Sequence, residues 1–284
     1  MLIYDDTSAM FSFFRKRQDA PSPPPVTAAV PDGARVYAIG DIHGCADLFE
    51  ALIDAIEADD AAAPPAETTI VLLGDLVDRG PDSAGVLRAA RDLQARREVR
   101  ILAGNHEEMF DASFDSLDTL RQFLRFGGRE TLLSYGIDRR AYSRASLDEL
   151  QEMMAEAVPM ADRAFMKGFE DSIRIGNYVF VHAGIEPGVP LGEQDTKRLR
   201  WIREPFLSHV DPHDDLVIVH GHTITDDPED KGNRIGVDTG AYARGRLTAL
   251  VLEGKARRYI SASHVDPDAP ERGVAIRHDP PRPD

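Results

Sequence analysis

The chain has 284 residues, with 42% hydrophobic and 29% charged side chains, which is enough to build one sizeable core or two modest ones. Asp and Glu outnumber Lys and Arg by 49 to 33, and the resulting net charge of −16 disfavours general binding to nucleic acid. The single cysteine excludes an internal disulfide, and no apolar run is long enough to cross a membrane. We therefore expect a cytoplasmic protein with no transmembrane segment and no nucleic acid partner.

The two ends of the chain differ in composition from its middle. Residues 18–33 are rich in Pro and Ala and are typical of an extended linker, so we expect residues 1–33 to form a flexible N-terminal arm. From residue 263 the chain is polar and rich in Pro, which predicts a loosely attached C-terminal tail over 263–284. A folded domain over residues 34–262 lies between them.

The middle of the chain alternates short apolar runs with segments of helical periodicity. The first half predicts, in chain order, a strand over 35–39, an amphipathic helix over 46–58, a strand over 69–73, a helix over 83–96 and a strand over 99–102. Residues 107–170 are mostly helical in pattern and interrupt the alternation as an insertion. Strands with hairpin-like spacing follow over 172–175, 178–181, 216–219, 234–237 and 247–252. The pattern indicates one layered α/β domain with a helical elaboration.

Five of the predicted strands end in residues that bind metals or let the backbone turn tightly. The segments are Gly40-Asp41-Ile42-His43-Gly44, Gly74–Gly80, Gly104-Asn105-His106-Glu107, His182-Ala183-Gly184 and His220-Gly221-His222-Thr223. Asp, His and Asn supply the oxygen and nitrogen ligands of divalent metals, and Gly allows a close backbone approach. Each segment alone is typical of a turn, but all five in order indicate a site at the strand ends, where α/β folds bind ligands.

This series of motifs, GDIHG, GDLVDRG, GNHE, HAG and GHT, resembles the calcineurin-like metallophosphoesterases. It resembles in particular the PPP-type serine/threonine protein phosphatases, with their bacterial and phage members, and the likeness extends through Trp201–Glu204 and Val237–Ala241. The resemblance implies a metallophosphoesterase catalytic domain over 34–262. Its fold would be an α/β, four-layer αββα sandwich of two mixed sheets flanked by helices, with the helical insertion at about 107–170.

The resemblance also implies two divalent metal ions, with manganese as the first expectation and iron or zinc as alternatives. The implied ligands of one ion are Asp41, His43 and Asp75, and those of the other are Asp75, Asn105, His182 and His222. Asp75 would bridge the ions, since a shared carboxylate holds two cations about 3.5 to 4 Å apart. A water or hydroxide held by both metals would be the nucleophile. The roles of His220 and Asp238 stay open.

The resemblance gives further residues roles in catalysis. His106 resembles the general acid that protonates the leaving oxygen, and Asp78 resembles the carboxylate that orients it. Arg79 and Arg203 match positions that hold phosphate oxygens, for which a planar guanidinium is suited. For Arg203 a surface ion pair with Glu204 is the alternative. Cys45 has no base arranged beside it in the motif, so we expect it to pack rather than to react.

The resemblance implies a hydrolase that removes phosphate from phosphorylated Ser or Thr in proteins or peptides, and a monomer, which is the default in this family. The enzymatic alternatives are a symmetrical dinucleoside polyphosphate (diadenosine tetraphosphate) hydrolase and a broad small-molecule phosphomonoesterase. Enzymes that cut diadenosine tetraphosphate symmetrically tend to lack the carboxylate found here as Asp78, which favours the phosphoprotein substrate. A pseudo-phosphatase that only binds phosphoproteins is the non-enzymatic alternative, and the completeness of the residue set opposes it.

Overall fold

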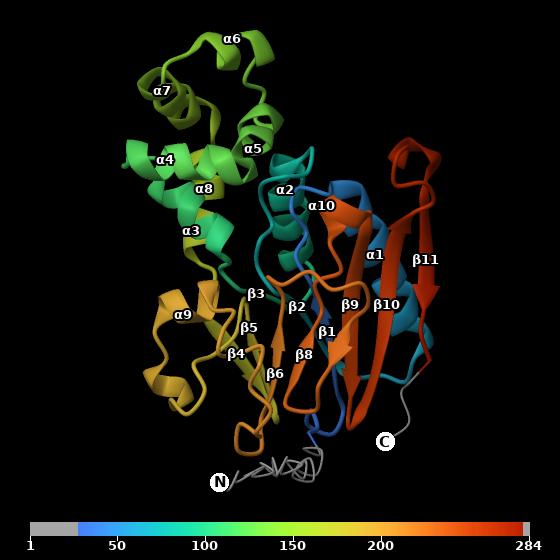
Figure 1. Ribbon diagram of the computed structural model, residues 1–284. Coiled ribbons are helices and arrows are strands. Elements are labelled where there is room, and N and C mark those ends of the chain that lie inside the picture. Colours follow the sequence, from blue (N-terminus) through green and yellow to red (C-terminus); the bar gives the residue numbers. More distant parts are fainter. Residues whose placement is uncertain (1–27, 281–284) are drawn as a thin grey trace, which may run out of the picture.

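A computed structural model describes residues 28–280, which form two β-sheets with helices on their outer sides (Figure 1). Residues 1–27 of the expected N-terminal arm and residues 281–284 lie outside the described part of the chain. Among the described residues, no helix combines the length and the apolar character that crossing a membrane requires.

The larger sheet has six strands in the order β11-β10-β9-β1-β2-β3. Their bounds are β1 (Ala34–Ile39), β2 (Glu67–Leu72), β3 (Val99–Ile101), β9 (Arg246–Glu253), β10 (Ala256–His264) and β11 (Val274–His278). β1, β2 and β3 run parallel, whereas β9, β10 and β11 join by antiparallel pairing. The carboxyl ends of β1, β2 and β3 therefore lie at one edge of the sheet.

The smaller sheet has five strands in the order β4-β5-β6-β8-β7. Their bounds are β4 (Ser172–Ile175), β5 (Tyr178–Val181), β6 (Val217–His220), β7 (Glu229–Asp230) and β8 (Arg234–Gly236). The pairs β4·β5 and β7·β8 are antiparallel, but β5, β6 and β8 are parallel. The expected strands are thus present, although the hairpin-like spacing did not predict these parallel pairs.

Alternation along the strands places the two sheets face to face. Val36 and Ala38 of β1 lie in a buried cluster with Phe180 and Val219 of the smaller sheet. Because successive side chains of a strand point to opposite faces, Tyr37 packs into a different cluster on the outer side of the larger sheet. The two sheets are therefore the central layers of the fold.

Helices form the outer layers. α1 (Ala46–Ala62) and α2 (Ser83–Gln94) pack on the outer face of the larger sheet. α9 (Thr196–Trp201) covers the smaller sheet, where Leu199 joins a buried cluster with Val181 of β5. This arrangement confirms the expected α/β architecture of two mixed sheets flanked by helices.

The predicted helical insertion gathers at one end of the molecule, at the upper left of Figure 1. It comprises α3 (Asn105–Ala112), α4 (Leu117–Phe123), a π-helical turn (Leu124–Gly128), α5 (Arg129–Ser134), α6 (Arg139–Arg144), α7 (Leu147–Ala157) and α8 (Met160–Lys167). Phe110 of α3 stacks on Phe123 of α4, with ring centroids 5.2 Å apart, inside the same core that α1 and α2 share. The insertion is therefore part of the main core.

Three short helical segments complete the structure. α10 (Ala241–Arg244) connects β8 to β9, and one-turn 3₁₀ helices cover Leu191–Glu193 and Pro270–Arg272. The first lies in the connection from β5 to α9 and the second in the connection from β10 to β11.

The structure differs from the sequence-based expectation at both ends of the folded region. Ala28 and Val30, within the expected linker, are each 2% exposed, and the Val30 N–H donates to the carbonyl of Gly254. At the other end, the expected tail contains β11, which pairs with β10 and is mostly exposed. Backbone hydrogen bonds to β10 hold this edge strand in place. Because β11 does not depend on burying one apolar face, its sequence lacks the alternation that would predict a strand.

Candidate metal centre

The predicted site residues come together at the carboxyl ends of the parallel strands of both sheets. The implied metal ligands are Asp41 and His43 after β1, Asp75 after β2, Asn105 after β3, His182 after β5 and His222 after β6. The loops that carry them are conformationally strained. Among the described residues, six other than Gly have a positive φ, and five of these belong to the predicted site: His43 (47°), Asp75 (51°), Asp78 (73°), Arg79 (69°) and His222 (62°). Such strain is typical of functional sites, where the surrounding structure holds it in place.

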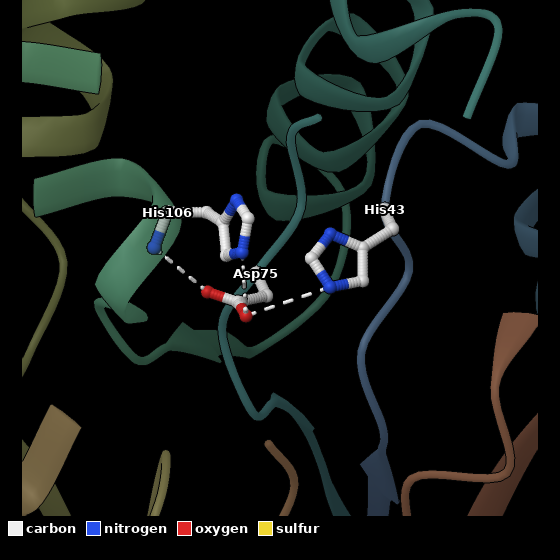
Figure 2. A group of neighbouring side chains, drawn as sticks. All are labelled: His43, Asp75 and His106. Atoms are coloured by element: carbon white, nitrogen blue, oxygen red, sulfur yellow. Dashed lines mark hydrogen bonds and ion pairs between the residues drawn. The ribbon is translucent and has the colours of Figure 1, made fainter. Parts of the chain in front are cut away.

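The Asp75 carboxylate is the centre of a first group of potential ligands (Figure 2). Its Oδ2 lies 3.5 Å from Nε2 of His43 and 4.0 Å from Nε2 of His106, while its Oδ1 accepts a hydrogen bond of 3.0 Å from the His106 N–H. All three side chains are almost fully buried. One ligand atom from each of the three side chains lies within 4.8 Å of the other two, so the three atoms are close enough together to bind a single metal ion.

The same carboxylate oxygen belongs to a second group on its other side. Asp75 Oδ2 lies 3.4 Å from Nε2 of His182, which in turn lies 3.2 Å from Nδ1 of His222. Oδ1 of Asn105 lies 3.0 Å from the same His182 nitrogen. Asp75 is therefore the one residue that these two groups of described residues share. The resemblance implied Asp41 beside His43 and Asp75, whereas the first group found here contains His106 instead.

The donor set fits divalent cations in both groups. His43 and His182 each donate Nδ1–H to a backbone carbonyl at 2.8 Å, of Val77 and Leu73 respectively, which turns the Nε2 lone pair toward the site. Lone pairs that converge on one point repel unless a proton or a cation lies between them. Two donors that lie about 2.1 Å from one ion are separated by about 3.0 Å at right angles and by about 4.2 Å on opposite sides, and the separations of ligand atoms given above fall within this range.

The electrostatics of the site support this interpretation. Burial opposes a charge on His182, but the carboxylates of Asp75 and Asp41 outweigh it and raise its pKa to about 10. Burial lowers the pKa of His43 to about 3 and that of His222 to about 2, so both rings are neutral, as metal ligands must be. The carboxylates thus place a strong negative potential at Nε2 of His182, where a divalent ion would replace the proton.

Asp41 lies in neither of these two groups. Its carboxylate is buried, and both of its oxygens accept the backbone N–H of His222 at 3.0 Å. In this arrangement Asp41 orients the loop that carries His222 and adds negative charge to the site. Its role as a metal ligand stays a prediction.

The expected pair of His106 and Asp78 is formed. Nδ1 of His106 lies 2.6 Å from Oδ2 of Asp78, and the other carboxylate oxygen accepts a 2.6 Å hydrogen bond from the hydroxyl of Thr131 in α5. Burial opposes a charge on His106, but the carboxylates of Asp75 and Asp78 outweigh it, so the pKa of His106 is raised. Thr131 therefore connects the insertion to this pair, and no motif in the sequence indicated its role.

The two predicted phosphate-binding arginines lie on opposite sides of the site. Nη1 of Arg79 lies 3.0 Å from Nε2 of His43, and Nη2 lies 2.9 Å from Nε2 of His106. Arg203 donates to the hydroxyl of Thr223 at 2.9 Å and to the carbonyl of His222 at 3.2 Å. The alternative ion pair of Arg203 with Glu204 is not formed.

Glu107 has a structural role that the sequence did not reveal, although it belongs to the GNHE motif. Its buried carboxylate accepts four backbone N–H groups, from Asp75 (3.0 Å), Leu76 (2.7 Å), Val77 (3.3 Å) and Gly104 (2.9 Å). Bonds from several N–H groups to one carboxylate are among the stronger hydrogen bonds in proteins. Glu107 thereby fixes the strained loop that presents Asp75.

The structure also places the residues whose roles were open. The buried ring of His220 packs against Phe206 and lies 3.3 Å from Arg234, and His220 belongs to neither ligand group. Asp238 is buried near Asp41, and its carboxylate accepts the N–H of Gly240. Burial raises the pKa of the Cys45 thiol to about 12, so this thiol stays neutral, as expected for a packing residue.

The chain is similar to known proteins along most of its length. A family model described as calcineurin-like phosphoesterase matches residues 34–251. Bis(5'-nucleosyl)-tetraphosphatase PrpE (asymmetrical) of Anoxybacillus flavithermus is 27% identical, over 75% of this chain and 88% of that protein. A symmetrical bis(5'-nucleosyl)-tetraphosphatase of Acidovorax sp. is 34% identical, but over only 54% of this chain and 44% of that protein.

Two solved structures share the fold. A cold-active protein tyrosine phosphatase has a TM-score of 0.53 and 21% identity, over 82% of this chain and 79% of its own. A protein described provisionally as a diadenosine tetraphosphatase has a TM-score of 0.52 and 21% identity, over 89% of this chain and 98% of its own. At this level of identity the likeness establishes the fold alone.

The Glu107 interactions predict that Glu107→Gln lowers the free energy of unfolding by about 2 kcal/mol, because the amide –NH₂ replaces an oxygen that accepts backbone N–H groups. Urea unfolding followed by circular dichroism measures the change. The matched control is Glu108→Gln, since the neighbouring Glu108 lies nearer the surface and contacts Arg200 and Trp201. Equal stability of the two variants would contradict the role given to Glu107.

Proposed function

Because the chain belongs to the calcineurin-like phosphoesterase family, we propose that it hydrolyses dinucleoside polyphosphates with the help of two divalent metal ions, manganese being the first candidate. The observation that carries the proposal is the position of the Asp75 carboxylate, which lies between His43 on one side and His182 on the other. The same carboxylate lies beside His106, the histidine that is paired with Asp78. The names of the relatives that align along three quarters of the chain support this substrate class.

The phosphoprotein substrate expected from the sequence has less support. The presence of Asp78 argued only against symmetrical cleavage of diadenosine tetraphosphate. A relative that covers 75% of the chain carries the name of an asymmetrical enzyme, so this argument does not oppose a dinucleotide substrate. We therefore propose asymmetrical cleavage, which divides four phosphates into a nucleoside monophosphate and a nucleoside triphosphate.

The proposed metal ligands are those that the motifs imply: Asp41, His43, Asp75, Asn105, His182 and His222. Divalent ions bound there would supply positive charge that neutralises phosphate oxygens and makes a nearby water more acidic. The domain boundaries, the monomeric state and the cytoplasmic location stay predictions.

The chain's own residues would bind the phosphates and move a proton. Arg79 and Arg203 would bind phosphate oxygens through paired N–H groups, and together with the two cations they would reverse the local sign of an acidic surface. A phosphate oxygen held by Nη2 of Arg79 also lies beside Nε2 of His106, because these two atoms are 2.9 Å apart. The protonated ring, oriented by Asp78 through Nδ1, donates its Nε2 proton to the leaving oxygen.

Metal-stripped protein reloaded with Mn²⁺ should cleave diadenosine tetraphosphate to AMP and ATP and should lose this activity in EDTA. The variant His106→Asn should be about 100-fold slower or more, since it lacks the proton donor. Chromatography of the products measures both results, with glycerol 2-phosphate and a phosphoserine peptide tested in parallel. The control Asp92→Asn, at an exposed carboxylate of α2, should keep full activity.

Each other outcome of this experiment contradicts the proposal in a defined way. ADP as the sole product would indicate symmetrical cleavage. Phosphate release from the peptide without cleavage of the dinucleotide would restore the phosphoprotein hypothesis. No hydrolysis with Mn, Fe or Zn would favour the binding pseudo-phosphatase.

The hydrogen-bonded carboxylate of Asp78 helps to raise the pKa of His106, and this contribution predicts the direction of a pH effect. Only the protonated ring donates, so kcat should fall as the pH rises through this pKa. Asp78→Asn removes a negative charge beside His106, so the pKa of His106 and the fall in kcat should both move to lower pH. The value of kcat should also be about 10- to 100-fold lower, as is found when the partners of other site histidines are replaced. Profiles of kcat against pH test this, and an unchanged alkaline limb in the variant would contradict the role of Asp78.

A further inference from the structure

A few large apolar side chains are markedly exposed in the described part of the chain. They are Phe126 (51%), Met160 (71%), Val210 (73%), Tyr242 (40%), Val265 (62%) and Ile276 (40%). The two aromatic members come from segments far apart in the sequence, yet Arg79 contacts both the ring of Tyr242 and the backbone carbonyl of Phe126. Two exposed aromatic residues that both contact a predicted phosphate-binding arginine require an explanation that the exposed aliphatic residues do not.

Tyr242 borders the site from α10. The guanidinium carbon of Arg79 lies 4.7 Å from the centre of the Tyr242 ring, and the ring meets the His43 ring edge to face with centroids 5.2 Å apart. The cation–π contact orients Arg79, while two fifths of Tyr242 remains exposed to solvent. Tyr242 therefore presents an aromatic surface at the rim of the candidate metal centre.

Phe126 borders Arg79 from the insertion. Its carbonyl lies 3.4 Å from Nε of Arg79, and the carbonyl of Gly127 accepts the Arg79 backbone N–H at 3.0 Å. Gly127 has a φ of 110°, and a Cβ at this position would lie 2.6 Å from Cγ of Arg79, so only Gly permits the contact. The π-helical turn is thus pressed against Arg79, with half of the Phe126 side chain exposed at its surface.

We propose that Phe126 and Tyr242 form a subsite on which a nucleobase of the substrate stacks while Arg79 holds the adjacent phosphate. This inference rests on the proposed function and specifies which part of a nucleotide these residues recognise. Every base has a flat π-face that stacks on aromatic rings, and an uncharged base is not repelled by a protein with a net charge of −16.

Binding to a catalytically inactive protein tests the subsite directly. With Mn²⁺-loaded His106→Asn protein, calorimetry compares AMP with ribose 5-phosphate, which differ only in the base. AMP should bind about 5- to 100-fold more tightly, the effect of one base–aromatic stack. Adding Phe126→Ala should remove most of this preference, and Phe126→Trp should retain it. Tyr242→Phe should also retain it, because the ring remains.

The control variant is Met160→Ala, which removes an exposed apolar side chain from α8 and should leave the preference unchanged. Equal binding of AMP and ribose 5-phosphate, or a preference that survives Phe126→Ala, would overturn the subsite. Tighter binding of O-phosphotyrosine than of AMP would overturn it in favour of a peptide. Cleavage of diadenosine tetraphosphate by the wild-type protein is measured separately, so a failure there overturns the proposed function and leaves the result on the subsite intact.

Discussion

The buried carboxylate of Asp75 is the constraint on which the rest of the site depends. It is 1% exposed and lies within 4.0 Å of three imidazole rings. A buried charge is costly unless it is paired and hydrogen bonded, so the surrounding structure is organised to balance it. Strands of both sheets bring His43 and His182 to it, while Glu107 holds its strained loop in place. The two-sheet fold thus positions one carboxylate between two groups of ligands.

The helical insertion does more than frame the site. Thr131 of α5 donates to Asp78, and Gly127 of the π-helical turn accepts from the backbone of Arg79. Both contacts act on the segment that follows Asp75. The geometry of His106, the proposed proton donor, and of Arg79, proposed to bind phosphate, therefore depends on how the insertion packs. Phe126 gives the insertion an exposed aromatic side chain beside this region.

Much of the fold and of the candidate site could be predicted from the sequence. The strands have strong apolar runs, and they end in polar motifs that differ from ordinary turns. The predicted strands over 172–175 and 178–181 match β4 and β5, and the motif residues meet at the expected edge of the sheets. β11 was missed because backbone pairing rather than apolar burial holds it. Thr131 and Tyr242 were missed because single residues from distant segments have no spacing that reveals them. The place of Asp41 beside the His222 N–H likewise depends on tertiary structure.

The number of bound ions tests the central claim most directly. Equilibrium dialysis against Mn²⁺, followed by elemental analysis, should give two ions per wild-type chain and one in His43→Ala, which alters only the first group. In Asp75→Ala both groups lose their shared ligand, so binding of both ions should be lost. Retention of one or two ions by a folded Asp75→Ala protein would contradict the shared role of this carboxylate.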